Sequence, residues 1–215
     1  MKNFVISYSC GKDSTLALYR MIKDGYNPIA MIVTFYEDDT RSWLHGVSED
    51  LLDQISKSLN IPIIKSKHNS SNYESAFENA LKIGKEMGAD TCVFGDIDIM
   101  DHKQWGINRC SVAGLSAHYP LWQENRKKLT HEFIDSGFSA IVKAVSKQYK
   151  LNKSILGMNF TKSLVNDIEK TGADACGENG EYHTFVYNGP LFQKEIRFNA
   201  YGIVDSQYSF AINIW

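Results

Sequence analysis

Residues 9–14, which read SCGKDS, decide how the rest of the chain is interpreted. They follow an apolar run, Asn3 to Tyr8, whose aromatic and β-branched content is typical of a buried strand. After them, Leu18, Met21 and Ile22 recur at helical spacing, so the sequence predicts a strand, a tight turn and a helix start. At such a junction a glycine lets the backbone approach a ligand, and the free N–H groups of the helix N-terminus face an anion. The stretch therefore predicts a phosphate-binding loop.

This loop differs from the two commoner phosphate-binding motifs. A Walker A loop needs G-x-x-x-x-G-K-[ST] and the dinucleotide fingerprint needs G-x-G-x-x-G, whereas here one glycine precedes Lys-Asp-Ser. The stretch resembles the PP-loop, S-G-G-x-D-S, of the N-type ATP pyrophosphatases, and a helix cap after a turn is the alternative interpretation. The resemblance implies cleavage of ATP between the α and β phosphates. It implies that ATP is bound by Ser9, Cys10, Gly11, Lys12, Asp13 and Ser14.

Composition places the chain among globular proteins. Its 215 residues, 43% of them hydrophobic, suffice for one large domain or two small ones with a real core. A net charge of -2 with scattered lysines argues against a nucleic-acid surface. The cysteines lack zinc-site or C-x-x-C spacing, which favours a reducing cytoplasm, and no stretch approaches a membrane span. We therefore expect a cytoplasmic protein without structural disulfides.

The first hundred residues alternate strand and helix patterns. Apolar runs of strand length recur at 29–36, 61–66 and 91–95, with amphipathic helical patterns between them. Near-continuous apolar strands that alternate with helices are typical of a parallel sheet covered on both faces. The sequence predicts that residues 1–100 form a Rossmann-like α/β domain, and the PP-loop resemblance implies that it is of the HUP or PP-loop ATPase type and binds ATP.

Ligands of such sheets bind beyond the carboxyl ends of the strands. Gly95 and Asp96 follow the fourth predicted strand, so we expect both beside the phosphates. There Asp13 and Asp96 are candidate ligands of Mg²⁺, which prefers oxygen donors. The connection 37–47, with Arg41, Trp43 and His45, is long for a strand-to-helix loop and is expected to lie over the nucleotide.

Residues 101–215 are expected to form a smaller α+β domain that binds the substrate. The pattern predicts a helix that Gly137 ends, a strand at 138–146 and a helix capped by Thr161. The final run, 208–215, reads as a strand that lies either in the core or in a contact between two copies of the chain.

A second informative stretch, residues 172–192, reads GADACGENGEYHTFVYNGPLF. Glycines bracket Glu178, and an extended strand from Glu181 would place Glu181 and His183 on one face and Thr184 on the other. A glutamate and a histidine on one face can polarise ammonia, bind an amine or ligate a metal. The alternative is a glycine turn that leads into a partly exposed strand.

Several motifs together resemble the diphthine-ammonia ligase family. They are SCGKDS, the GDI at 95–97, Arg109 ahead of PLW at 120–122, and CGENGEYHTFVYNGPLF at 176–192. The resemblance implies that ATP activates a carboxylate as an acyl-adenylate and that ammonia displaces AMP to leave an amide. The implied partners are ATP, ammonia and a carboxylate acceptor, which in that family is diphthine, a modified histidine of translation elongation factor 2.

The resemblance also implies roles for individual residues. It implies that the loop 9–14 and Gly95 bind ATP and that Asp13 and Asp96 bind Mg²⁺. It places Arg109, Trp122 and Thr184 in the substrate site. With this mechanism in mind, we expect catalytic roles for Lys12, Asp13, Asp96, Glu178, Glu181 and His183.

The chain departs from the family pattern at three positions. The family reads closer to G-E-G-G-E-[FY]-E-T, whereas this chain has Asn179 for a glycine and His183 for a glutamate, and Cys10 replaces a loop glycine. These changes leave open a different carboxylate acceptor. Two further alternatives are a non-catalytic ATP-binding module and a transfer-RNA modifying enzyme, although sulfur transfer requires paired reactive cysteines.

Overall fold

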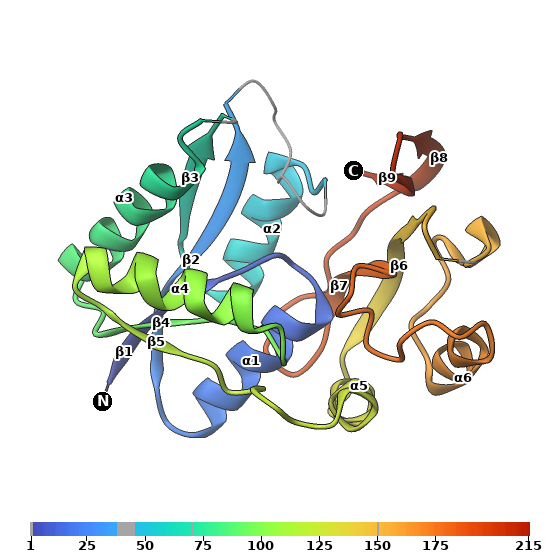
Figure 1. Cartoon of the computed structure of the whole chain (residues 1–215), viewed down its shortest axis with the longest axis horizontal. Coiled ribbons are helices and arrows are strands. Elements are labelled where there is room, and N and C mark those ends of the chain that lie inside the picture. The colour runs from blue at the N-terminus through green and yellow to red at the C-terminus, as the bar shows by residue number, and fades with distance from the viewer. Residues whose placement is uncertain (1, 38–45, 70, 150) are drawn as a thin grey trace.

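The computed structural model describes residues 2–215 except 38–45 and the single positions 70 and 150. Those residues form two sheets with helices packed around them (Figure 1). Arg41, Trp43 and His45 of the expected loop over the nucleotide lie outside the described residues.

The first sheet is entirely parallel and has five strands in the order β3-β2-β1-β4-β5. The first strand lies at its centre, so the loop that follows this strand opens at the middle of the sheet's carboxyl edge. The α/β fold predicted from the alternating pattern is confirmed. The strands are β1 (Asn3–Ser7), β2 (Asn27–Tyr36), β3 (Ile63–His68), β4 (Thr91–Val93) and β5 (Ser116–His118).

Helices cover both faces of this sheet (Figure 1). On one face Leu16 and Leu52 pack against Phe4, and on the other Phe77 and Cys110 pack in one cluster with the neighbouring strand residues, which include Val5. Successive strand residues face opposite layers, which is why the strands read as continuous apolar runs. The helices of the first face are α1 (Lys12–Lys23) and α2 (Glu49–Leu59), and those of the second are α3 (Tyr73–Glu86) and α4 (Met100–Ala113).

The parallel sheet ends later than the sequence indicated. We expected a boundary near residue 101, but α4 and β5 continue the first unit to His118. The helical pattern of α4 is blurred because Met100, Ile107 and Val112 are exposed apolar residues on it. An amphipathic signal needs those positions to be polar, so the helix carried little periodicity to detect.

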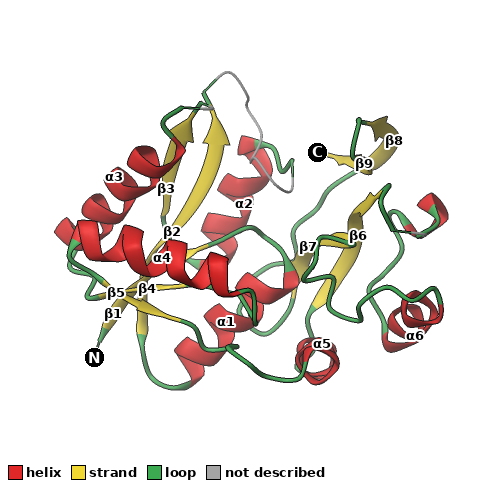
Figure 2. Ribbon diagram, in the orientation of Figure 1, coloured by secondary structure: helices red, strands yellow, loops and turns green. Residues whose placement is uncertain are grey.

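The second sheet is antiparallel, with four strands in the order β7-β6-β9-β8 (Figure 2). The final strand pairs with β6 on one side and β8 on the other, so it is an interior strand of this sheet. The second unit is α+β, as predicted. Its elements are α5 (Arg126–Asp135), β6 (Ser139–Ser146), the short helix η1 (Lys153–Ile155), α6 (Lys162–Lys170), β7 (Tyr182–Asn188), β8 (Ala200–Asp205) and β9 (Ser209–Ile214).

The two units share one continuous apolar core. Phe4 and Leu16 of the first unit belong to the same buried cluster as Val142 and Phe185 of the second. At the seam, the N–H of Val186 donates to the carbonyl of Cys10 over 2.9 Å. The phosphate-loop stretch is therefore held against β7, and the second unit closes over one side of it.

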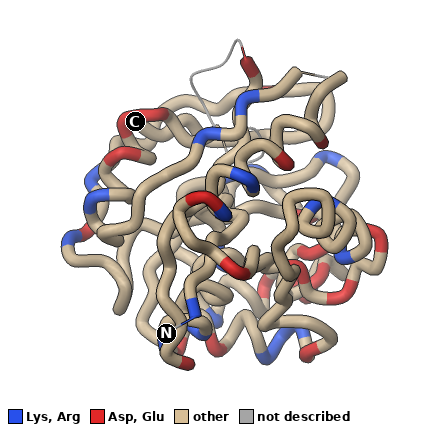
Figure 3. Tube along the Cα trace, turned by 90° about the vertical axis from the view of Figure 1, so that its left-hand side faces the viewer, with Lys and Arg blue, Asp and Glu red and all other residues tan. Residues whose placement is uncertain are grey.

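Charges are mixed over the surface. Figure 3 shows Lys and Arg interspersed with Asp and Glu along the chain, as the near-neutral net charge predicts. Within the part of the chain that the structure describes, no helix combines the length and apolar character that crossing a membrane requires.

Candidate functional site

A cleft with a volume of about 530 Å³ lies where the two units meet. Three segments line it: the loop after β1, the loop after β4 with the start of α4, and the segment that enters β7. It therefore brings together stretches that are far apart in the sequence. Its lining residues are Ser7, Ser9, Gly11, Lys12, Asp13, Ser14, Gly95, Asp96, Ile99, His102, Gly177, Glu178, Asn179, Gly180, Tyr182, His183 and Thr184.

The SCGKDS stretch forms the N-terminus of α1, with Gly11 as the N-cap. The N–H of Gly11 donates to Ser9 Oγ at 3.3 Å, and the N–H of Lys12 donates to Thr184 Oγ1 at 3.0 Å. Among the described residues, the N–H groups of Asp13 and Ser14 have no hydrogen-bond partner. Two free donors at the positive end of a helix make an anion-binding position beside the cleft.

Cys10 contributes its backbone rather than its side chain. Its φ of 65° lies in the left-handed region that favours glycine, which explains why a glycine is common at this position of the loop. The thiol is fully buried, and burial raises its pKa, so it stays neutral. The expected contact of Cys10 with ATP is therefore not made by its side chain, which packs in the core.

Lys12 and Asp13 form a close ion pair at the mouth of the loop. Lys12 Nζ lies 2.6 Å from Asp13 Oδ2, with the lysine side chain 5% exposed. Burial opposes the charged ammonium, but the charge and hydrogen bond of Asp13, together with the neighbouring Cys176 and Tyr182, raise the pKa of Lys12 well above its usual value. The ammonium also lies 5.6 Å from the centre of the Tyr182 ring. Lys12 is therefore a fixed positive charge in the cleft.

Gly95 allows the loop after β4 to approach the start of α1. A Cβ at this position would lie 2.8 Å from the backbone nitrogen of Ser14, which is too close for any side chain. The glycine predicted from the sequence thus brings Asp96 beside the helix N-terminus.

Asp96 is paired with a histidine that the sequence analysis did not select. His102 Nδ1 lies 3.2 Å from Asp96 Oδ1, and this hydrogen bond raises the pKa of His102. Both residues line the cleft. His102 could have been found only by recognising α4, since it stands in the first turn of that helix.

Two carboxylates organise the segment 174–181. Asp174 Oδ1 accepts from the N–H of Cys176 at 2.8 Å and of Gly177 at 3.0 Å. Glu181 accepts from the N–H of Asp174 at 3.3 Å and from the backbone and side-chain amides of Asn179 at 3.0 and 2.9 Å. Glu181 is 2% exposed and is not among the described residues that line the cleft, so its carboxylate supports the loop.

The expected alternation of side chains along this strand is not observed. We expected Glu181 and His183 on one face, but β7 begins after Glu181, and His183 lines the cleft together with Thr184. The pairing of β6 with β7 shifts register between Val142 and Ala144, so the extra residue of this irregularity, Lys143, lies on β6 and not on β7.

Glu178 is held in the cleft by a backbone donor. Its Oε1 accepts from the N–H of Ile97 at 3.0 Å. Burial raises the pKa of Glu178 to about 7, and the charges of Asp13 and Asp96 act in the same direction. A carboxyl of this kind changes charge near neutral pH, or accepts a cation that offsets the crowding of negative charge.

One group of residues that could hold a metal ion combines Asp13 with Cys176 and Glu178. Ligand atoms of Asp13, Cys176 and Glu178 lie within 4.8 Å of one another. Burial raises the pKa of the Cys176 thiol, so it stays neutral, and its Sγ lies 3.6 Å from Asp13 Oδ1. The carboxylates of Asp13 and Glu178 are the hard oxygen ligands that Mg²⁺ prefers, and they fit this ion better than a thiol does.

The structure places two predicted substrate residues away from the cleft. Arg109 Nη1 pairs with Glu74 at 2.5 Å and with Glu78 at 2.9 Å, so it joins α4 to α3. Trp122 lies under Lys103 Nζ, 4.1 Å from the ring centre. Neither is among the described residues that line the cleft.

Comparisons with known proteins give the family of the chain. A diphthine–ammonia ligase of Danio rerio is 26% identical over 218 residues, which cover 89% of this chain and 84% of the relative. The ligase of that name from Mus musculus is 25% identical, with coverages of 87% and 79%. A solved structure described as a predicted subunit of tRNA methyltransferase from Methanocaldococcus jannaschii has a TM-score of 0.48 at 16% identity, and the match covers 91% of this chain and 100% of that one.

Family models match both units. The diphthamide synthase N-terminal domain matches residues 1–117 and the C-terminal domain matches residues 125–210. The division lies where the parallel sheet ends, later than the boundary expected from the sequence. The chain belongs to the diphthamide synthase family.

Proposed function

We propose that this chain is an ATP-dependent ligase that converts diphthine, ammonium and ATP into diphthamide, AMP and pyrophosphate through an acyl-adenylate. The relatives named diphthine–ammonia ligase support the reaction class. The observation that carries the proposal is the cleft, where a helix N-terminus with a fixed lysine faces carboxylate and imidazole groups of the second unit. The helix N-terminus and the lysine suit a polyphosphate, and the carboxylate and imidazole groups suit an incoming amine.

The phosphate side of the cleft serves the adenylation step. The free N–H groups of Asp13 and Ser14, with the ammonium of Lys12, would stabilise charge on the pyrophosphate as it leaves. Asp13 and Glu178 would hold Mg²⁺, which supplies further stabilisation of charge on the phosphate oxygens when bound. The acceptor carboxylate attacks the α phosphorus, and the bond between the α phosphorus and the bridging oxygen breaks.

His183 is the best placed base for the second step. Burial and the charge of Lys12 lower its pKa, so the imidazole is neutral near pH 7 and can accept a proton. As the nitrogen of ammonia bonds to the acyl carbon, His183 takes a proton from that nitrogen and AMP leaves with the electron pair of the broken C–O bond. The exchange of glutamate for histidine at this position is compatible with amide formation.

The test uses purified protein with ATP, Mg²⁺, ammonium and elongation factor 2 that bears diphthine. AMP and pyrophosphate are measured together with the mass of the modified residue. Release of AMP with replacement of a hydroxyl by an amino group on the factor is the expected result. If the factor stays unchanged under conditions in which it binds the protein, the diphthine assignment is wrong.

A second candidate is an amide-forming ligase of the same mechanism that acts on another carboxylate. The cleft residues that favour it are His183 and Asn179, which differ from the family pattern and line the site. In the same assay, AMP formed with a panel of small carboxylic acids and ammonium, but not with the factor, would select this candidate.

A further inference from the structure

Arg126, the first residue of α5, makes hydrogen bonds and ion pairs to residues that have no part in the phosphate chemistry proposed above. Its Nε and Nη2 donate to the two carboxylate oxygens of Asp98 at 2.8 and 2.5 Å. Its Nη1 lies 3.2 Å from Asp174 Oδ2, and Nη2 donates to Asn179 Oδ1 at 3.4 Å. One guanidinium therefore contacts the loop after β4 and the loop before β7.

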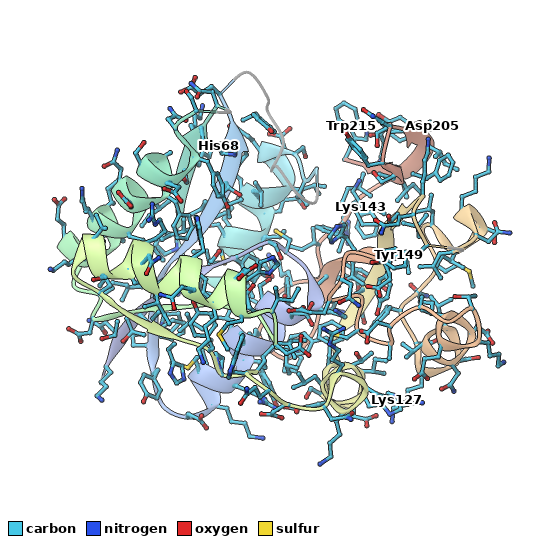
Figure 4. The ribbon with its side chains drawn as sticks, viewed as in Figure 1. His68, Lys127, Lys143, Tyr149, Asp205 and Trp215 are labelled. Atoms are coloured by element: carbon cyan, nitrogen blue, oxygen red, sulfur yellow. The ribbon has the colours of Figure 1, made fainter. Side chains whose placement is uncertain are left out.

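These contacts lie on either side of the bond that holds Glu178. Asp98 follows Ile97, whose N–H donates to Glu178 Oε1, while Asp174 and Asn179 belong to the segment that carries Glu178. A third contact supports the same segment from the bend after β6, where the hydroxyl of Tyr149, a residue labelled in Figure 4, donates to the carbonyl of Asn179. Arg126 itself is not among the described residues that line the cleft.

We propose that Arg126 is a positioning residue that fixes the two loops relative to each other and so orients Glu178 in the cleft. The inference rests on the proposed function for its effect on the reaction. A planar guanidinium can bind Asp98 with two parallel hydrogen bonds and still reach Asp174, whereas the point charge of a lysine cannot hold both. The geometry thus requires arginine rather than any cation.

If Arg126 formed only a surface ion pair, its replacement would lower the stability slightly and would not change catalysis specifically. Arg20 provides the matched control, because its side chain is 20% exposed against 22% for Arg126, and it also binds two carboxylates. Those partners, Glu124 and Glu132, join α1 to the region of α5, and neither is among the described residues that line the cleft.

The first measurement is AMP formation by Arg126→Gln, Arg126→Lys and Arg20→Gln. We expect kcat to fall about 10- to 100-fold in both Arg126 variants, with a smaller change in the KM for ATP, because Lys12 and the N–H groups of the loop 9–14 are untouched. Arg20→Gln should keep the wild-type kcat. Equal losses in the Arg20 and Arg126 variants, or full activity of Arg126→Lys, would overturn the proposal.

A double-mutant cycle asks whether Arg126 acts through Glu178. In the Glu178→Gln background, replacement of Arg126 should cause little additional loss of kcat, because the oriented group is already changed. Independent losses that multiply would contradict a positioning role.

Amide hydrogen exchange tests the positioning without turnover. The N–H groups of Ile97, Cys176 and Asn179 should exchange faster in Arg126→Gln than in wild type, and should not change in Arg20→Gln. If wild type forms no AMP, the proposed function fails while this measurement still decides the role of Arg126. Unchanged exchange at these amides would overturn the positioning role even in an active enzyme.

Discussion

The two loops that form the cleft are built in different ways. The loop 9–14 is a contiguous motif that uses backbone N–H groups and the end of a helix. The segment 174–181 is held by side chains, since Asp174 and Glu181 accept its N–H groups and Arg126 ties it to another loop. A site of the first kind is encoded locally, whereas one of the second kind depends on residues that meet only in the folded protein.

This difference separates binding from positioning. The first loop presents fixed donors to an anion, and the second presents Glu178 and His183 to whatever reacts with the activated group. Changes in the first loop should therefore abolish adenylation, while changes in the second should loosen the site and alter its response to pH. Each of the following predictions tests that separation.

The largest effect is expected for Lys12→Ala. Removal of the ammonium leaves charge on the departing pyrophosphate without its side-chain partner, so AMP formation should fall about 100- to 1,000-fold. AMP release is the measurement, and Lys23→Ala at the exposed end of the same helix is the control. Near-normal AMP release from the Lys12 variant would contradict the assignment of the loop.

A smaller effect, on stability, is expected for Glu181→Gln. An amide keeps one acceptor oxygen but turns an NH₂ group toward the donors that Glu181 now satisfies, so the free energy of unfolding should fall by about 1–3 kcal/mol. Urea unfolding measures the change. Glu169→Gln, which removes an exposed ion pair with Lys127, should cost at most about 1 kcal/mol. Equal losses in the two variants would show that Glu181 does not organise the segment.

The smallest effect concerns Glu178 and pH in protein free of nucleotide and Mg²⁺. Its pKa is about 7 in the folded chain against 4.5 when unperturbed, so the folded state binds more protons between these values. The contribution of Glu178 to the free energy of unfolding therefore falls as pH rises through this window. As pH rises through this window, the free energy of unfolding of wild type should fall by about 1–2 kcal/mol relative to that of Glu178→Gln, a figure already reduced for solvent screening.

Glu124 supplies a control of opposite sign for that titration. The hydrogen bond from Arg20 lowers the pKa of Glu124, so its contribution to stability is present above the unperturbed pKa and is lost as pH falls. Unfolding curves of Glu178→Gln and Glu124→Gln across pH should therefore deviate from wild type in opposite directions. If both variants deviate from wild type in the same direction, burial does not raise the pKa of Glu178 as proposed.

Sequence patterns predicted the features that depend on local chemistry. The apolar runs predicted the parallel sheet, and Thr161 is the N-cap of α6, as expected. The contiguous loop 9–14 was found for the same reason. The helix α4 was not predicted, because exposed apolar residues on it obscure the helical spacing of its buried apolar residues.

The rest of the candidate site depends on tertiary contacts. Whether Glu181 faces the cleft or the loop is decided by the N–H groups around it, which no local pattern reveals. Arg109 turns to Glu74 and Glu78 because α3 packs beside α4. Arg126 acquires its partners only when separate loops meet, and His102 reaches Asp96 through the first turn of the unpredicted helix α4, so sequence reasoning passed over both.

The continuous core across the two units has a consequence for how the chain matures on the ribosome. The cluster that Phe4 of the parallel sheet forms with Leu16 of α1 is completed by residues such as Val142 and Phe185, which are translated later. Until β7 emerges, that cluster lacks part of its cover, and the carbonyl of Cys10 lacks the N–H of Val186. We therefore expect the first unit to complete its core only after β7 has been translated, and a fragment that stops at residue 118 should aggregate more than the whole chain does.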